Sequence, residues 1–266
     1  MTNMTAMAQT IAICTQKGGV GKTTTASNLA AALGERGGRV LAIDFDPQFA
    51  LTRRFGVSPA GRATLYDVFA AGVSVEEVIV TNVCPSVDLA PAARELRSIE
   101  LSLVGERKRE YFLCRALADV QSRYDFILID CPPNLGLLTV NALCASEEAL
   151  VPVDVEDADA LQGAEELIAI VRELAADGDP IRLGSLFKVR VDRRRQAYKA
   201  IAAELDELAR DLDLPVASTE IPDSALFHKS VIVQRPLVEW RPDSVEAYAY
   251  RQLADEVFAR RGANVG

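Results

Sequence analysis

Short runs of consecutive apolar residues alternate along the chain with longer segments in which apolar positions recur every three or four residues. The apolar runs occupy residues 11–14, 40–44, 126–130, 149–153 and 184–189. Such runs, without polar alternation, are typical of strands in a parallel sheet that is covered on both faces. The pattern therefore predicts an α/β fold with a single doubly wound, mainly parallel sheet flanked by helices.

Three of the longer segments predict helices. Residues 23–36 are rich in alanine and stop before two glycines, which is a helix-termination signal. Residues 244–261 predict a closing helix. Residues 196–212 predict a third helix, with one apolar face made by Ala197, Ile201, Leu205, Leu208 and Leu212.

Length and composition fit one globular domain. The chain has 266 residues, of which 49% are apolar and 25% charged. No repeat, low-complexity segment or linker divides it, so we expect one domain over residues 9–262 after a flexible leader at 1–8. The leader lacks the basic and apolar regions of a secretory signal. No apolar stretch approaches the ~18 residues that a membrane span needs.

Cysteine and histidine usage narrows the chemistry. The five cysteines are an odd number and no two lie closer than 13 residues, which does not fit a disulfide framework or a zinc knuckle. Reduced thiols, mostly in the core, are expected. The single histidine, His228, excludes a multi-histidine metal site and is expected to be a surface or interface residue rather than a catalyst.

The strongest chemical signal is the segment QKGGVGKTT at residues 16–24, which follows the first predicted strand and opens the first predicted helix. Glycines let successive amide groups converge on phosphate oxygens, and a helix N-terminus favours an anion. Lys22 can reach the β- and γ-phosphates, and the Thr23 hydroxyl can bind Mg²⁺. The loop is expected to bind nucleotide phosphates through Lys17, Gly18, Gly19, Val20, Gly21, Lys22, Thr23 and Thr24.

This loop departs from the usual phosphate-binding pattern. Gln16 stands where a glycine is usual, and Lys17 adds a second lysine at the start. The segment resembles the deviant Walker A loop of the ParA/MinD ATPases. That resemblance implies ATP and Mg²⁺ as cofactors and an ATP-dependent homodimer, in which Lys17 reaches the partner's phosphates and Gly18 lies where the two chains pass closely.

Two further predicted strands end in carboxylates. Residues 40–44 lead to Asp44 and Asp46, and the run at 126–130 ends in Asp130. Acids at the carboxyl ends of parallel strands line the ligand crevice, so Asp130 is expected to hold Mg²⁺ through water. The triplet Asp-Pro-Gln at 46–48 resembles a ParA switch segment, which implies that Asp46 orients the hydrolytic water, with Asp44 as second choice. Asp46 is also an expected Mg²⁺ residue, with Thr23 and Asp130. Asp46, Asp130, Lys17 and Lys22 are the expected catalytic residues.

Similarity to partition-type ParA proteins extends over about residues 9–262. It includes PPNLG at 132–136 and ALQG at 160–163. The segment after Ile221 departs from the family pattern, so Pro222 and Asp223 are carried over only as neighbours of the adenine. Without a strong general base, slow hydrolysis stimulated by a ParB-like or other cargo adaptor is expected.

A local basic segment changes the meaning of the overall charge. The chain carries −9 in total, which by itself argues against a nucleic-acid binder. Residues 182–199, however, hold seven cations against one acid, a local +6 that leaves −15 for the rest. The family resemblance implies non-specific contact with nucleoid DNA in the ATP state of a cytoplasmic protein. The expected contacts are Lys188, Arg190, Arg193, Arg194, Arg195 and Lys199.

Two other functions share the loop. A MinD-like membrane switch would need a basic amphipathic helix at the C-terminus, and residues 256–262 are short with one aromatic side chain. An iron–sulfur reductase of the nitrogenase iron-protein type would need two suitable cysteines, and only Cys131 lies in a switch region. A partition ATPase is therefore preferred. The residues do not say whether its cargo is a chromosome, a plasmid or a protein assembly.

Overall fold

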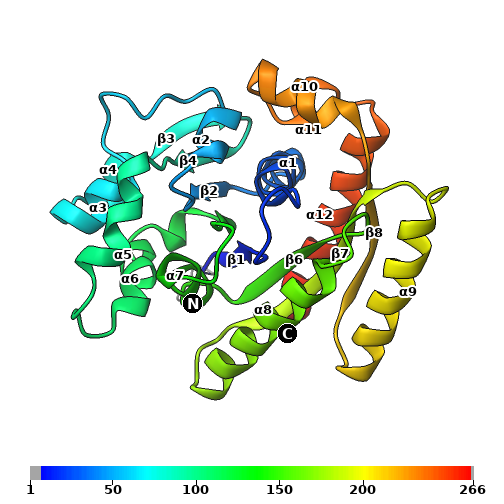
Figure 1. Cartoon of the computed structure of the whole chain (residues 1–266). Coiled ribbons are helices and arrows are strands. Elements are labelled where there is room, and N and C mark those ends of the chain that lie inside the picture. The colour runs from blue at the N-terminus through cyan, green and yellow to red at the C-terminus, as the bar shows by residue number, and fades with distance from the viewer. Residues whose placement is uncertain (1–6, 265–266) are drawn as a thin grey trace, which may run out of the picture.

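The computed structural model describes residues 7–264, and side chains as far as residue 261. Its strands are β1 (Gln9–Ile13), β2 (Val40–Asp44), β3 (Val80–Cys84), β4 (Val87–Ala90), β5 (Phe126–Asp130), β6 (Glu148–Asp154), β7 (Arg182–Val191) and β8 (Val216–Pro222). They form one sheet in the order β3-β4-β2-β5-β1-β6-β7-β8 (Figure 1). Only the β3–β4 pair is antiparallel. The predicted doubly wound, mainly parallel sheet is confirmed.

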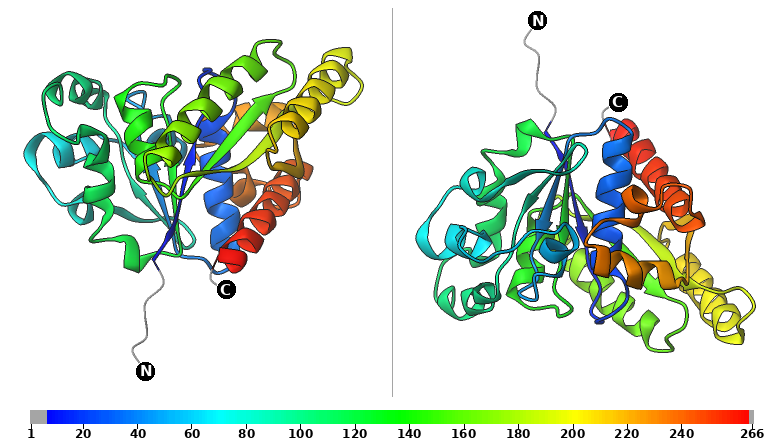
Figure 2. Two further views of the ribbon diagram at one scale, coloured as in Figure 1. Left: turned by 90° about the horizontal axis from the view of Figure 1, so that it is seen from below. Right: turned by 90° about the horizontal axis from the view of Figure 1, so that it is seen from above.

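Helices cover both faces of this sheet (Figures 1 and 2). One core lies under α1, α11 and α12, and the other lies under α3 to α9. Short 3₁₀ turns at Arg94–Ser98, Arg109–Tyr111 and Gln121–Arg123 complete the connections. The α-helices are α1 (Lys22–Glu35), α2 (Ala50–Arg54), α3 (Leu65–Ala71), α4 (Val75–Val78), α5 (Ile99–Ser102), α6 (Phe112–Leu117), α7 (Leu137–Cys144), α8 (Ala160–Ala176), α9 (Gln196–Asp211), α10 (Ala225–Val233), α11 (Leu237–Trp240) and α12 (Val245–Asn264).

All five predicted strands are present, and three strands were missed. The missed strands β3, β4 and β8 lie at the two ends of the sheet. β3 and β8 are edge strands, whereas β4 pairs with β3 and β2. Polar residues interrupt all three (Thr81 and Asn82 in β3, Asp88 in β4, Ser218 to Glu220 in β8), so they lack the continuous apolar run that marks a central strand. In β8, for example, Ser218 is exposed and Thr219 is buried.

The three predicted helices are also present as α1, α9 and α12. In α9, Ile201 and Leu205 are buried as expected, but Ala197 is exposed. Ala202 and Ala209 complete the buried side instead. This helix lies beside the outer strands of the sheet (Figure 1). It is buried along one narrow stripe of side chains at positions 201, 205 and 209.

The structure describes the start of the expected domain and all five cysteines. Residues 1–6 of the expected leader lie outside the described range. Ala8 is buried, and its amide donates to the Gln121 carbonyl at 3.3 Å, so it already belongs to the folded part. All five cysteines are free thiols, and all but Cys114 are buried.

The strand order brings the chemical residues together. β5, β1 and β6 are consecutive in the sheet, with β2 and β7 on either side. Because these strands are parallel, their carboxyl ends lie at one edge. The glycine-rich loop, Asp46 and Asp130 therefore meet there.

Candidate functional site

The loop between β1 and α1 turns on glycines with left-handed backbone. Gly19 has φ +79° and Gly21, the N-cap of α1, has φ +91°. A side chain with a Cβ is strained at such angles, so glycine is the residue that fits. No side chain caps α1 at Gly21. The first amide groups of this helix are therefore available to an anion.

Lys22 lies under this loop rather than in solvent. Its side chain is buried, and Nζ donates to the carbonyl oxygens of Lys17 at 2.9 Å and Thr15 at 3.4 Å. Burial lowers the pKa of the Lys22 ammonium, and the charge of Asp130 opposes this shift. The loop thus holds a partly desolvated cation at the place where phosphates are expected.

Lys17 points to the loop after β6. Its Nζ lies 2.5 Å from Asp157 Oδ2 and 3.5 Å from Asp159 Oδ2. The hydrogen bond that Lys17 donates to Asp157 raises the pKa of Lys17, although burial opposes it. In the single chain, the lysine expected to serve a partner molecule is bound to its own acidic loop.

Asp44 and Asp130 occupy opposite positions of the β2–β5 pair, and both are fully buried. Asp44 Oδ2 accepts hydrogen bonds from the Thr52 amide at 2.7 Å and the Thr52 hydroxyl at 2.6 Å. Burial raises the pKa of Asp44 to about 7, and these hydrogen bonds oppose the rise. Asp44 therefore anchors the start of α2 at the end of β2.

Asp130 differs because neither of its carboxyl oxygens has a hydrogen-bond partner among the described residues. Burial raises its pKa well above the usual range, and the Asp44 charge adds to the rise. Thr23 and Lys22 oppose the rise, although the Thr23 hydroxyl does not reach hydrogen-bonding geometry. Buried polar groups are ordinarily paired, so this orphaned carboxyl is suited to a cation or its bound water.

Asp46 is half-buried and borders a groove of about 590 Å³. Its Oδ1 accepts a hydrogen bond from the Gln48 amide at 2.8 Å. Burial raises the pKa of Asp46, while the Gln48 amide and the charges of Lys22 and Arg97 oppose the rise. The groove is lined by Gly18, Gly19, Gly21, Lys22, Thr23, Thr24, Asp46, Ala50, Arg53, Arg54, Pro133, Val231 and Gln234.

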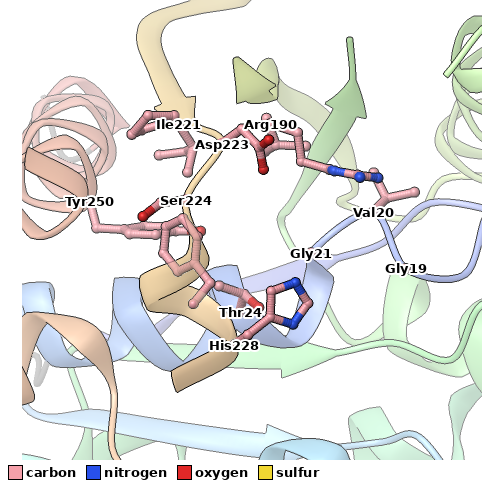
Figure 3. A pocket seen from close by; sticks show the side chains of 13 residues that line it. Gly19, Val20, Gly21, Thr24, Arg190, Ile221, Asp223, Ser224, His228 and Tyr250 are labelled. Carbon is pink, nitrogen blue, oxygen red and sulfur yellow. The ribbon is translucent and has the colours of Figure 1, made fainter. Parts of the chain in front are cut away.

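A second cavity of about 240 Å³ opens on the other side of the loop. Pro222 and Asp223 line it, as their expected place near the adenine requires, and their contact with adenine stays a prediction. Figure 3 shows side chains from α1, β7, α10 and α12 around this space. The lining residues are Gly19, Val20, Gly21, Thr24, Val189, Arg190, Ile221, Pro222, Asp223, Ser224, Phe227, His228 and Tyr250.

Sequence reasoning missed several of these residues. His228, expected to be incidental, borders the cavity. Arg190, expected at DNA, also borders it, with φ +58° and Nη1 2.8 Å from Asp154 Oδ2 (Figure 3). The rarity of histidine in this chain was one signal that could have drawn attention to His228. Nothing in the charge pattern separated Arg190 from its basic neighbours.

Most cations of the basic segment form ion pairs with carboxylates of the same chain. Of the six expected DNA contacts, all but Lys199 form an ion pair within the described residues. Lys188 is only 13% exposed, whereas the Arg193 and Arg194 side chains are 75% and 90% exposed. The pairs are Lys188 with Asp206 and Glu220, Arg190 with Asp154, Arg193 with Glu220, Arg194 with Asp192, and Arg195 with Glu156, Asp192 and Asp223.

The two alternative functions depend on the C-terminal helix and on Cys131. The end of this helix is held by ion pairs, and Cys131 is buried. Arg260 contacts Glu148 and Arg261 contacts Asp125, which ties the end of α12 to the sheet. Cys131 is 1% exposed, and burial raises its thiol pKa, as does the neighbouring Cys14. No helix within residues 7–264 is both long and apolar enough to cross a membrane.

Comparison with known sequences identifies relatives along nearly the whole chain. A family model described as an AAA domain matches residues 8–180. The sporulation initiation inhibitor protein Soj of Bacillus subtilis is 36% identical over 255 residues, covering 95% of this chain and 99% of Soj. The chromosome partitioning protein ParA of Caulobacter vibrioides is 34% identical over 254 residues, 94% of each chain.

Solved structures extend this likeness to the fold. Cobyrinic acid a,c-diamide synthase from Mycobacterium smegmatis, with bound ADP and magnesium, has a TM-score of 0.83 at 31% identity and covers 97% of both chains. The cell division ATPase MinD of Pyrococcus furiosus has a TM-score of 0.77 at 29% identity, covering 95% of this chain and 99% of MinD. Together with the loop geometry and the two sequence relatives, these matches confirm the resemblance noted in the sequence: the chain belongs to the ParA/MinD family of P-loop ATPases.

Proposed function

We propose that this ParA-type partition ATPase binds ATP with Mg²⁺ and acts as a nucleotide-dependent switch that positions cargo. The observation that carries the proposal is the buried, unpartnered carboxyl of Asp130 beside the Lys22 ammonium and the glycine loop. The Asp130 carboxyl calls for a cation, whereas Lys22 and the uncapped amides of α1 call for an anion. A Mg²⁺–triphosphate supplies the two together.

The chain's own residues fit that ligand. The free amides at the start of α1 and Lys22 would bind phosphate oxygens, and Thr23 and Asp130 would hold Mg²⁺, with Asp46 near the metal. Bound Mg²⁺ would neutralise charge that develops on the phosphates. The cavity bordered by Pro222 and Asp223 would take the base end of the nucleotide.

Hydrolysis by this site should be slow. Phosphoryl transfer needs positioning and charge neutralisation more than covalent chemistry. Asp46 would orient the attacking water, and its hydrogen bond with the Gln48 amide would hold its carboxylate in place. A slow site suits a timer, whose rate a ParB-like or other cargo adaptor would raise.

Dimerisation and DNA contact complete the proposed cycle. The ATP state would form a homodimer in which Lys17 leaves Asp157 for the phosphates of the other molecule. The exposed cations Arg193, Arg194 and Lys199 would then bind duplex phosphates without regard to sequence. Exposed ion pairs are weak, so phosphate can displace their carboxylates. The protein would act in the cytoplasm, on the nucleoid in its ATP state.

A nucleotide-dependent gel shift tests this function. The purified chain is mixed with non-specific duplex DNA at physiological salt with MgATP, MgADP or no nucleotide, and its mass is measured in parallel by light scattering. We expect a dimer and DNA retention with MgATP only. Equal retention in all three conditions would contradict a switch. Firm binding to liposomes with MgATP, but not to DNA, would favour the MinD-like membrane function.

A further inference from the structure

Arg54, the last residue of α2, is a buried cation between two other elements. The residue is only 8% exposed to solvent. Nη1 donates to the Ser230 hydroxyl in α10 at 2.9 Å, and Nη2 donates to the Thr24 hydroxyl in α1 at 3.0 Å. The guanidinium therefore bridges the first turn of the phosphate-loop helix and α10.

Both of these partners are neutral. No carboxylate of the described residues lies within ion-pair distance of Arg54, whereas Arg190, Arg193, Arg194 and Arg195 all have one. Burial lowers the pKa of Arg54, and Tyr250 and the charge of Asp130 oppose this shift only in part. Buried charges in proteins are normally paired, because an unpaired one loses its hydration without compensation.

Arg54 also borders the space beside the phosphate loop. It lines the groove of about 590 Å³ together with Gly21, Lys22 and Thr23. Guanidinium is a fixed fork of donors that matches phosphate oxygens. An anion bound in this groove would supply the missing negative charge.

We propose that Arg54 is a further nucleotide-positioning residue, whose uncompensated charge is neutralised by the phosphates of the bound nucleotide. The proposal rests on the phosphate site described under Proposed function. Ser230 and Thr24 hold the guanidinium in place before the nucleotide arrives. Because α10 also carries His228 at the second cavity, Arg54 joins the phosphate end of the site to the base end.

The test compares Arg54→Met with the wild type in two measurements. Thermal unfolding without nucleotide gives the stability of the empty protein, and calorimetric titration gives the affinities for MgATP and MgADP. Removing an unpaired buried charge should leave the melting temperature unchanged or higher. Affinity for both nucleotides should fall about 10- to 100-fold, since a charged hydrogen bond to phosphate is lost. Arg54→Lys should recover part of this loss because it keeps the charge.

Two variants control for other causes. Arg62→Met removes the same charge from an exposed residue outside this groove, and Ser230→Ala removes the α10 contact while keeping the Arg54 charge. Each should keep MgATP affinity within about threefold, because neither removes the buried cation. An equal loss in either control would overturn the proposal, as would a destabilised or unfolded Arg54→Met protein or one with normal affinity. A wild type that binds no nucleotide would instead overturn the proposed function.

Discussion

Lys17 Nζ lies 2.5 Å from Asp157 Oδ2 in the same chain. Asp159 contacts the same ammonium at 3.5 Å. If this lysine serves the phosphates of a second molecule, it must first leave these two carboxylates. The acidic loop after β6 therefore competes with dimer formation for one positive charge.

We expect Asp157→Asn with Asp159→Asn to dimerise more readily. Exposed ion pairs contribute roughly 0.2–1 kcal/mol, so half-maximal dimer formation should need about two- to fivefold less MgATP. Analytical ultracentrifugation over a series of nucleotide concentrations measures this. Asp119→Asn with Asp211→Asn, which neutralises two exposed acids outside these ion pairs, is the matched control. A requirement equal to or higher than that of the wild type would show that the contact does not oppose dimerisation.

Lys22→Ala should lose nucleotide binding. Its ammonium donates to the Lys17 and Thr15 carbonyls and is the buried cation of the loop. Losing a charged hydrogen-bond donor from the phosphate site should weaken MgATP binding about 100-fold or more. Titration calorimetry measures the affinity, and circular dichroism checks that the fold is intact. Normal ATP hydrolysis by this variant would place the site elsewhere.

Asp130→Asn should lower ATP hydrolysis without lowering the melting temperature of the empty protein. Burial and the neighbouring Asp44 disfavour the charged carboxyl, so the empty variant should melt at the same temperature or higher. Hydrolysis should fall about 10- to 100-fold, because Mg²⁺ would be held less well. The pair of measurements is a melting curve without Mg²⁺ and a phosphate-release assay over a Mg²⁺ titration. Unchanged hydrolysis at every Mg²⁺ concentration would exclude Asp130 from the metal site.

Reversing Arg193, Arg194 and Arg195 to glutamate should weaken DNA retention. About three phosphate contacts would be lost, which lowers affinity and flattens its salt dependence. ATP binding should stay intact. Reversal of the exposed residues 107–109, which also carry three cations, is the control with the same change in net charge. If both triple variants lose retention equally, the effect belongs to net charge and the segment is not the contact surface.

The thiols should react in a fixed order. Burial raises the pKa of Cys84 and Cys144 to about 12, so at pH 8 only about 1 in 10,000 of these groups is a thiolate. Cys114 is the one half-buried thiol and should react first with a disulfide reagent. Raising the pH should speed the slow phase, because thiolate increases towards pH 12. Cys114→Ser should lack the fast phase, and five equally fast thiols in the native protein would contradict this burial.

The sequence predicted the parts of this protein whose local pattern is set by burial on both faces. Central strands such as β1 and β5 contain continuous apolar runs, and the glycine loop has a spacing fixed by backbone geometry. The edge strand β8 was missed because its outward positions are polar. Family likeness supplied Lys17 as a residue of interest, but its partner Asp157 is 140 residues away in the chain and left no local signal.

Charge was the least predictable property. The basic segment looked like a free cationic face, yet the fold brings acids from β6, β8 and α9 to it. Arg54 shows the opposite case: it is buried without a carboxylate partner, and nothing around position 54 in the sequence predicts this. Counting charges along a chain does not show which of them meet.

The loop at 154–159 holds cations from three places: Lys17 through Asp157 and Asp159, Arg190 through Asp154, and Arg195 through Glu156. Added salt weakens these contacts as well as contacts with DNA. The protein's own carboxylates thus act as a built-in competitor that salt also suppresses. A plot of DNA affinity against ionic strength should therefore be shallower than the number of bound phosphates would give, and neutralising this loop should steepen it.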